Sequence, residues 1–291
     1  MANPFTDEGV IKLAEVNPAR RRFTRLLGSP GALDLTELAF AIAEEERGAV
    51  DLSASRDQLA ALVAGLKRQL QSANPGSAAE QSRLLCRFLA GDQSFLGNQD
   101  DYYEVDNSCL DQVLQRRQGI PISLALVYLH VGNGAGLNVR GVNFPGHFLV
   151  AVDCDQERAL IDPFSGQPLS ESQLQQLLQQ QTGDQQSLLA SLHRSCTVGE
   201  ILQRMLNNLR GIYLQRGEAE RVLACCDRIL LIDPDNSREI FQRITVYEQL
   251  NRQAEALAEL IRLRGLLDET PFRHEVERRI LDLDTGAAPL Q

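Results

Sequence analysis

The sequence predicts an α+β protein in three parts: a helical N-terminal region over residues 1–95, a mixed core over residues 96–195, and an all-α region over residues 196–291. Three observations support this division. Apolar residues recur at helical spacing in the first and last parts. Short apolar runs bounded by polar turns, typical of strands, occur between residues 138 and 162. They follow a segment that is apolar nearly all round, which predicts a small antiparallel sheet packed on a buried helix.

The N-terminal region carries three predicted helices. Residues 34–47 have apolar side chains at helical spacing, and Asp34 is suited to cap the first turn. A second helix is expected over residues 55–72, and the breaker NPGS separates it from a third over residues 78–90. The polar stretch that follows is aperiodic and is expected to form an ordered loop.

Composition limits the partners and the compartment. The net charge of −10 disfavours non-specific binding to nucleic acid or to an anionic membrane, because like charges repel. No stretch of 18 or more apolar residues suggests a transmembrane helix. The N-terminus lacks the basic and apolar regions of a signal peptide. We therefore expect a cytoplasmic protein.

The cysteines do not indicate a metal site. The six cysteines form no C-x-x-C pair and have no ligand spacing with the four histidines. This pattern is typical of free thiols in a reducing compartment. The sequence thus predicts neither a metal nor another cofactor.

A hairpin between residues 143 and 166 is the strongest candidate for chemistry. His147 opens one apolar run, and Asp162 ends the next. If these residues face each other across an antiparallel pair, the loop spans the four residues 153–156. The carboxylate could then orient the imidazole and leave its other nitrogen as a base. The alternative is that His147 is a turn residue and Asp162 caps the end of a strand.

The order of these elements resembles the transglutaminase-like superfamily, whose members share a papain-type Cys-His-Asp arrangement. The strings GIPISLAL, NFPGHF and LIDPFSG more closely resemble a bacterial subgroup often called SirB-type. That resemblance implies a helical N-terminal region, a transglutaminase-like core, and C-terminal tetratricopeptide repeats. His147 and Asp162 match the His and Asp of the superfamily.

The superfamily's nucleophile is missing at the expected place. The predicted core helix begins with Gly119-Ile-Pro-Ile-Ser123, which contains no Cys. Three alternatives remain open. Ser123 could be the nucleophile, Cys109 could serve from the preceding helix, or the site could have no covalent nucleophile at all.

Other residues are expected to line the same cleft. Chain order suggests that Tyr102, Tyr103 and Asn107, from the polar loop, form a wall of it, together with Asn143.

The final part contains a repeat. Tyr213 and Tyr247 are 34 residues apart, as are Gly217 and Asn251, and 34 residues is the period of the tetratricopeptide repeat. We therefore expect a protein or peptide partner to bind through residues 200–291. The favoured hypothesis is a non-catalytic binding or regulatory module, a pseudoenzyme. The alternative is an enzyme of acyl transfer or amide hydrolysis that uses Ser123 or Cys109 with His147 and Asp162.

Overall fold

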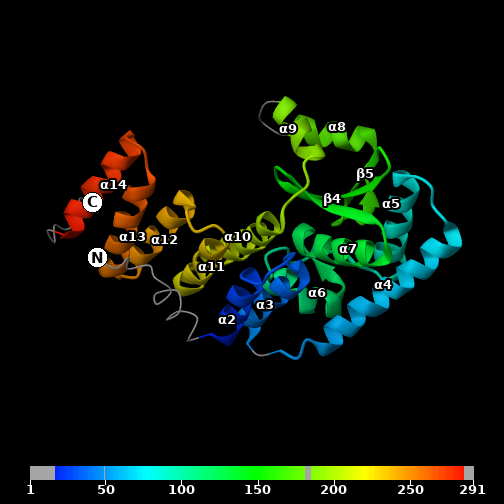
Figure 1. Ribbon diagram of the computed structural model, residues 1–291, viewed down its shortest axis with the longest axis horizontal. Helices are drawn as coiled ribbons and strands as arrows, with labels where there is room; N and C mark the ends of the chain where they lie inside the picture. Colours follow the sequence, from blue (N-terminus) through cyan, green and yellow to red (C-terminus); the bar gives the residue numbers. More distant parts are fainter. Residues whose placement is uncertain (1–16, 49, 181–184, 285–291) are drawn as a thin grey trace. The chain divides into compact units, whose positions relative to one another are not determined.

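The computed structural model describes residues 17–48, 50–180 and 185–284 (Figure 1). The sequence predicts that the N-terminus is not a signal peptide. Most of that segment lies outside the described residues. The chain divides into two compact units, one ending at Met205 and the other beginning at Leu206. No helix in the described ranges is long and apolar enough to cross a membrane.

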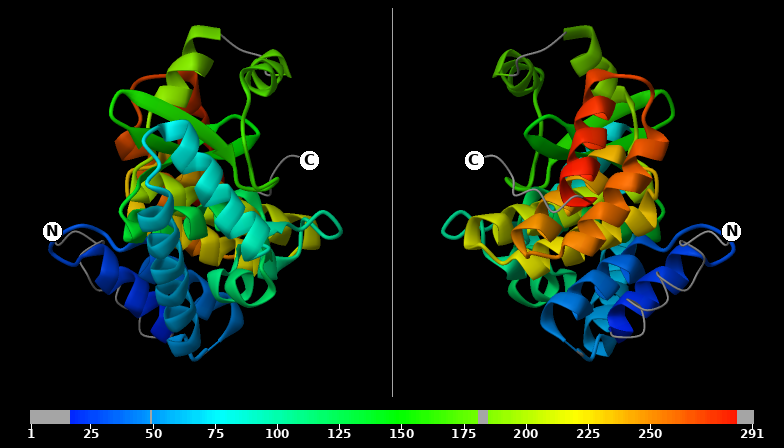
Figure 2. Two further views of the ribbon diagram at one scale, coloured as in Figure 1. Left: turned by 90° about the vertical axis from the view of Figure 1, so that its right-hand side faces the viewer. Right: turned by 90° about the vertical axis from the view of Figure 1, so that its left-hand side faces the viewer.

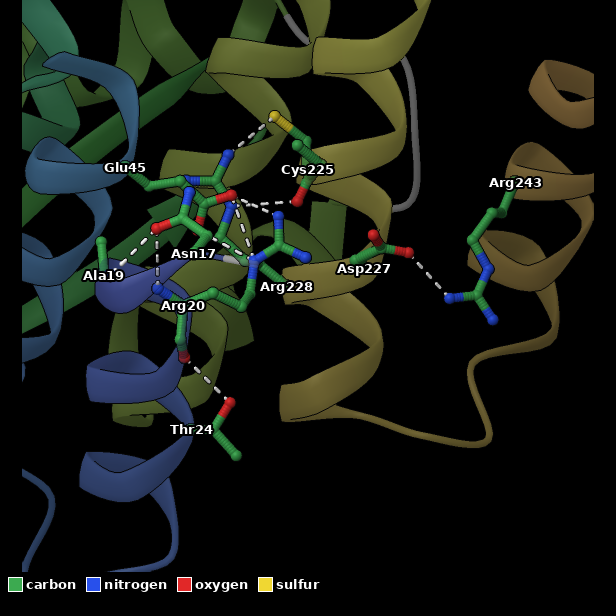
Figure 3. Close-up of polar contacts among 10 residues, drawn as sticks. Asn17, Ala19, Arg20, Thr24, Glu45, Cys225, Asp227, Arg228 and Arg243 are labelled. Carbon is green, nitrogen blue, oxygen red and sulfur yellow. Dashed lines mark hydrogen bonds and ion pairs between the residues drawn. The ribbon is translucent and has the colours of Figure 1, made fainter. Parts of the chain in front are cut away.

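The first unit begins with a series of helical elements, the first two of which start at side-chain caps. Asn17 accepts hydrogen bonds from the backbone of Ala19 and Arg20 at the start of the first helix (Figure 3). Asp34 does the same for Thr36 and Glu37, as predicted. These elements are α2 (Pro18–Leu27), α3 (Leu35–Arg47), α4 (Ser53–Ala73), α5 (Ala78–Cys86) and the π-helical turn η1 (Arg87–Asp92).

A connecting segment leads from η1 to the core helix. Its two short strands pair in parallel, and its helical turns are brief. The elements are β1 (Leu96–Gly97), η2 (Val105–Ser108), α6 (Leu110–Arg116) and β2 (Gln118–Gly119). The core helix α7 (Pro121–Ala135) follows, with Pro121 in its first turn, and it is buried along most of its length.

A four-stranded antiparallel sheet packs on α7. Its strands lie in chain order: β3 (Asn138–Phe144), β4 (His147–Cys154), β5 (Glu157–Asp162) and β6 (Gln167–Pro168). Helix α7 contacts β3 and β4 on one face, while α8 (Glu171–Gln180) and α9 (Gln185–His193) cover the other (Figure 1). Helix α5 contacts β5 and lies across the sheet in the left view of Figure 2. The predicted fold class is confirmed.

The register of the hairpin differs from the expected one by two residues. Val150 pairs with Ile161, and the strands stay paired as far as Cys154 and Glu157. The turn therefore holds only residues 155 and 156, not the four expected. His147 therefore lies outside the paired stretch of β4 and β5 and not opposite Asp162. On the other side of its strand it pairs with Phe144 of β3. Because the shift is two residues, every side chain keeps its expected face.

The second unit is an array of antiparallel helices. Helix α10 (Val198–Arg216) contains the boundary between the units. The helices that follow are α11 (Ala219–Ile232), α12 (Ser237–Gln249), α13 (Gln253–Leu266) and α14 (Pro271–Asp284). Each of these helices packs on the next.

The 34-residue repeat is visible in the backbone of the second unit. Gly217 and Asn251 both adopt left-handed conformations, with φ of 69° and 56°. The residue after each donates a backbone hydrogen bond to a tyrosine carbonyl: Glu218 to Tyr213 at 2.9 Å and Arg252 to Tyr247 at 2.8 Å. Asn tolerates this conformation better than most residues with a side chain, so it can replace the turn glycine of the first repeat.

The predicted boundaries at residues 95 and 195 do not coincide with the division into units. Helices α4 and α5, from the predicted N-terminal region, pack directly on α7 and on the sheet. Their apolar faces are therefore buried against the mixed core, and residues 17–205 form one packed body as far as they are described.

Candidate functional site

Asp162 and His147 lie on adjoining strands but make separate contacts. The carboxylate of Asp162 accepts hydrogen bonds from the backbone N–H groups of Phe164 at 2.9 Å and Ser165 at 3.3 Å. It therefore closes the turn after β5, the strand-end alternative stated above. The ring of His147 packs 6.3 Å from that of Phe144, centroid to centroid. Within the described residues, no hydrogen bond joins the imidazole to the carboxylate.

The strand register places His147 away from the core helix. His147 shares a sheet face with its partner Phe144, and that residue belongs to the apolar cluster beneath α8 and α9. The opposite face packs on α7, where a Cβ on Gly132 would meet the side chain of Val139 at 2.4 Å. The imidazole therefore lies on the face of the sheet away from α7, whereas a general base must come within hydrogen-bond reach of the group it deprotonates.

Ser123 is fully buried, and its hydroxyl is engaged. The backbone N–H of Ile120 donates to Ser123 Oγ at 3.1 Å, and Oγ donates to the carbonyl of Asn107 at 2.5 Å. The side chain thus satisfies one of the free donors at the start of α7 and fastens the preceding loop to it. The hydroxyl is a structural bridge in this arrangement.

Cys109 is also fully buried, at the N-cap position of α6. Burial raises the pKa of its thiol well above the usual value, and the nearby carboxylates of Glu46 and Asp111 raise it further. The thiolate is the nucleophilic form of cysteine. A thiol in these surroundings stays protonated at neutral pH, so it is a poor nucleophile.

The predicted wall residues separate into two groups. Asn107 is fully buried: its amide nitrogen donates to the carbonyl of Asp101 at 2.6 Å, and its oxygen accepts from Asn98 at 3.1 Å. It holds the loop together from inside, so its predicted place on a cleft wall is corrected. Tyr102 and Tyr103 are 41% and 56% exposed, with ring centroids 5.3 Å apart.

Asn143 lies on the α7 face of the sheet, opposite to that of His147. Its side-chain oxygen accepts a hydrogen bond from Arg204 at 3.5 Å. Burial raises the pKa of Tyr102, and the charge of Arg204 opposes that shift, so the two side chains are electrostatically coupled. Tyr102 and Asn143 therefore share Arg204 as a neighbour.

An open cleft of about 960 Å³ lies elsewhere in the first unit. Its walls are the end of α4, the outer side of α5 and η1, and the turn between β5 and β6. None of the site residues predicted from the sequence lines it. The residues that sequence reasoning missed include Arg83, Cys86, Arg87 and Ser165. One available signal was the pair of arginines at helical i,i+4 spacing.

The interior beside this cleft disfavours charge. Cys86 is 4% exposed, and burial, with a smaller contribution from Asp162, raises the pKa of its thiol to about 12. The hydroxyl of Tyr128 is buried and has no hydrogen-bond partner among the residues that the structure describes. Burial also raises the Tyr128 pKa well above its usual value. Cys86 is therefore an unreactive thiol at neutral pH.

Comparisons with known proteins agree with this organisation. The transglutaminase-like superfamily model matches residues 53–207, and a tetratricopeptide repeat model matches residues 209–280. A protein of Xylella fastidiosa is 34% identical over 201 residues, covering 68% of this chain and 72% of its own. One of Pseudomonas aeruginosa is 31% identical over 249 residues, covering 86% and 90% respectively.

The protein YchA of Escherichia coli is 29% identical over 225 residues, covering 77% of this chain and 83% of its own. All three relatives carry the name UPF0162. The resemblance to a transglutaminase-like core with repeats is confirmed, whereas none of these three relatives carries the SirB-type name. The chain belongs to the UPF0162 family of bacterial proteins, with a transglutaminase-like domain followed by tetratricopeptide repeats.

Proposed function

We propose that this protein is a non-catalytic protein-binding module, in which the transglutaminase-like domain has lost its covalent chemistry and the repeats engage a protein partner. One observation carries the first half of the proposal. The two candidate nucleophiles, Ser123 and Cys109, are fully buried in other contacts, and neither is hydrogen-bonded to His147 within the described residues. A nucleophile and its base must come within hydrogen-bond reach for this chemistry.

Covalent labelling tests the absence of a nucleophile. A fluorophosphonate and an iodoacetamide probe are each reacted with the wild type and with Ser123→Ala, Cys109→Ala and His147→Ala. We expect no labelling of residue 123 or 109 in the folded protein, because both side chains are inaccessible. Peptide mass spectrometry identifies the modified residues.

The matched control for this experiment is His193→Ala, which removes an exposed histidine from the end of α9. Labelling of Ser123 or Cys109 that disappears in His147→Ala and persists in His193→Ala would show a working triad. That result would replace the proposal with acyl transfer or amide hydrolysis.

The repeats support the second half of the proposal. Tetratricopeptide repeats form extended surfaces that bind other proteins. In the second unit several large apolar side chains are exposed, among them Ile261 at 46% and Phe272 at 40%. Phe272 packs edge-on against Phe241 of α12, with ring centroids 5.3 Å apart, and Arg279 lies over the Phe241 ring at 5.2 Å. Aromatic and arginine side chains are enriched at protein interfaces.

Site-specific photo-crosslinking in bacterial cells tests this surface. A photoreactive amino acid is placed singly at Ile261, at Phe272, and at the control position Lys67, an exposed residue of α4. We expect discrete protein adducts from the two positions in the repeats and none from position 67. Adducts from position 67 alone would contradict a partner bound through residues 200–291.

A further inference from the structure

The cleft in the first unit has an unusual charge for this protein. The chain carries a net charge of −10, yet two arginines and one glutamate line the cleft. The carboxylate of that residue, Glu80, accepts a hydrogen bond from the backbone N–H of Gly76 at 2.8 Å. Among the described residues, the side chains of Arg83 and Arg87 form neither an ion pair nor a hydrogen bond. Two cations and one anion therefore line the cleft, which leaves it with a net positive charge in an acidic protein.

Several other arginines of the same unit form ion pairs with carboxylates. Arg47 reaches Asp106 at 3.0 Å, Arg116 reaches Glu104 at 2.5 Å, and Arg56 reaches Glu37 at 2.7 Å. Carboxylates are thus abundant enough to pair with most guanidinium groups in this acidic chain. Arg83 and Arg87 have no such partner among the described residues, and of the arginines without one they are the two that line the cleft.

The two guanidinium groups are placed to act together. Arg83 lies on α5, and Arg87 follows four residues later at the start of η1. Residues at this spacing are neighbours on a helix surface, where like charges repel. An oxyanion between them removes the repulsion and can accept paired N–H bonds from a guanidinium fork. Ser165 and Gln167, on the opposite wall, add further polar groups.

The opposite wall is held in place by a specific turn. Asp162 fixes this turn through Phe164 and Ser165, and Gly166 continues it with φ of 69°. A Cβ at Gly166 would lie 2.3 Å from that of Ala90 in η1. The turn can approach the helix this closely only with glycine at this position. π-Helical turns such as η1 are frequent at functional sites.

We infer that this cleft binds the oxyanion of an organic ligand, a carboxylate or a phosphate, between Arg83 and Arg87. The apolar lining, which includes Leu84 and Leu96, receives the uncharged part of the ligand next to its acidic group. The volume of about 960 Å³ is in the range of small-ligand sites. This site lies in the first unit, so it is independent of the partner proposed for the repeats.

Titration calorimetry on the full chain tests the site with two probes. One is inorganic phosphate, and the other is a short blocked peptide with two glutamates beside a leucine. We expect saturable binding of at least one probe, weakened roughly tenfold or more in Arg83→Gln/Arg87→Gln, because charge-assisted hydrogen bonds are lost. Affinity should also fall as salt rises. Phosphate binding alone would indicate a phosphate ligand, and peptide binding alone a carboxylate.

The matched control is Arg25→Gln/Arg68→Gln, which removes the same charge from exposed positions outside the cleft. It should bind within about twofold of the wild type, since only screened long-range charge changes. Arg83→Lys/Arg87→Lys keeps the charge without the fork and should bind at an intermediate level. Thermal unfolding checks that each variant is folded. The inference is overturned if neither probe saturates the wild type, or if the two Gln double variants bind equally.

Discussion

Replacement of Arg243 by Met is expected to lower the free energy of unfolding of the second unit by about 3–5 kcal/mol. Arg243 lies in α12 and donates to Asp227 at 2.9 Å and to Glu259 at 2.6 Å; the first of these contacts is drawn in Figure 3. The side chains of Arg243 and Glu259 are 11% and 7% exposed. Removing the cation leaves the carboxylates of Asp227 and Glu259 in a poorly hydrated environment without its compensating charge.

Electrostatics explain why this arginine is charged despite its burial. Burial by itself lowers the pKa of Arg243, but the carboxylates of Glu259 and Asp227 outweigh that effect and raise the pKa above its usual value. The cation and its partners therefore stabilise one another across α11, α12 and α13. Removing one partner of a buried ion pair costs more free energy of unfolding than replacing both partners by apolar residues, because an uncompensated buried charge remains.

Urea denaturation followed by circular dichroism measures the change. The control is Arg238→Met, at an exposed position of the same helix, which should change stability by no more than about 0.5 kcal/mol. The double variant Arg243→Met/Glu259→Met should recover part of the loss, since one stranded carboxylate is removed with the cation. A loss below about 1 kcal/mol in Arg243→Met would contradict a structural role for the network.

Gly166→Ala is expected to destabilise the first unit by about 2–5 kcal/mol. The added methyl would meet Ala90 Cβ at 2.3 Å and Leu96 Cδ2 at 3.2 Å, and the residue must keep φ of 69°. The backbone conformation is strained for a side chain, and the contact with η1 forces the two walls of the cleft apart. The same measurement of unfolding free energy detects both effects together.

Gly91→Ala is the matched control on the other wall of the same cleft. Its added Cβ would lie 3.9 Å from Arg87 Cγ, an ordinary contact, and its backbone needs no left-handed conformation. Stability should therefore change by less than about 1 kcal/mol or increase slightly. Equal losses in the two variants would mean that the close approach of the turn at Gly166 is not what positions this wall.

Local chemistry was readable from the sequence because it acts within a few residues. Asp34 caps α3 through amides two and three residues away, so its role follows from residue type and spacing. Gly217 and Asn251 adopt the same backbone conformation in successive repeats, as the 34-residue period predicts. The buried character of α7 follows from its uniform apolar composition.

The register of the hairpin could not be predicted from the local sequence pattern. A shift of two residues leaves Leu149 and Leu160 on the same face, so the hydrophobic pattern fits both registers equally well. Only the backbone pairing from Val150 to Cys154 selects one of them. That selection decides that His147 lies outside the paired stretch and not opposite Asp162.

The sequence by itself therefore determined most of the helices and strands, the repeat, and the resemblance to a transglutaminase-like core, but it did not predict helix α2 or strand β6. The tertiary structure alone decided which side chains meet. Ser123 is occupied by the carbonyl of Asn107, and Arg83 and Arg87 face a wall built around Gly166, far away along the chain. Helix and turn propensities act over neighbouring residues, whereas a site is made of contacts between distant ones. Such contacts depend on burial and strand register, which no local pattern encodes.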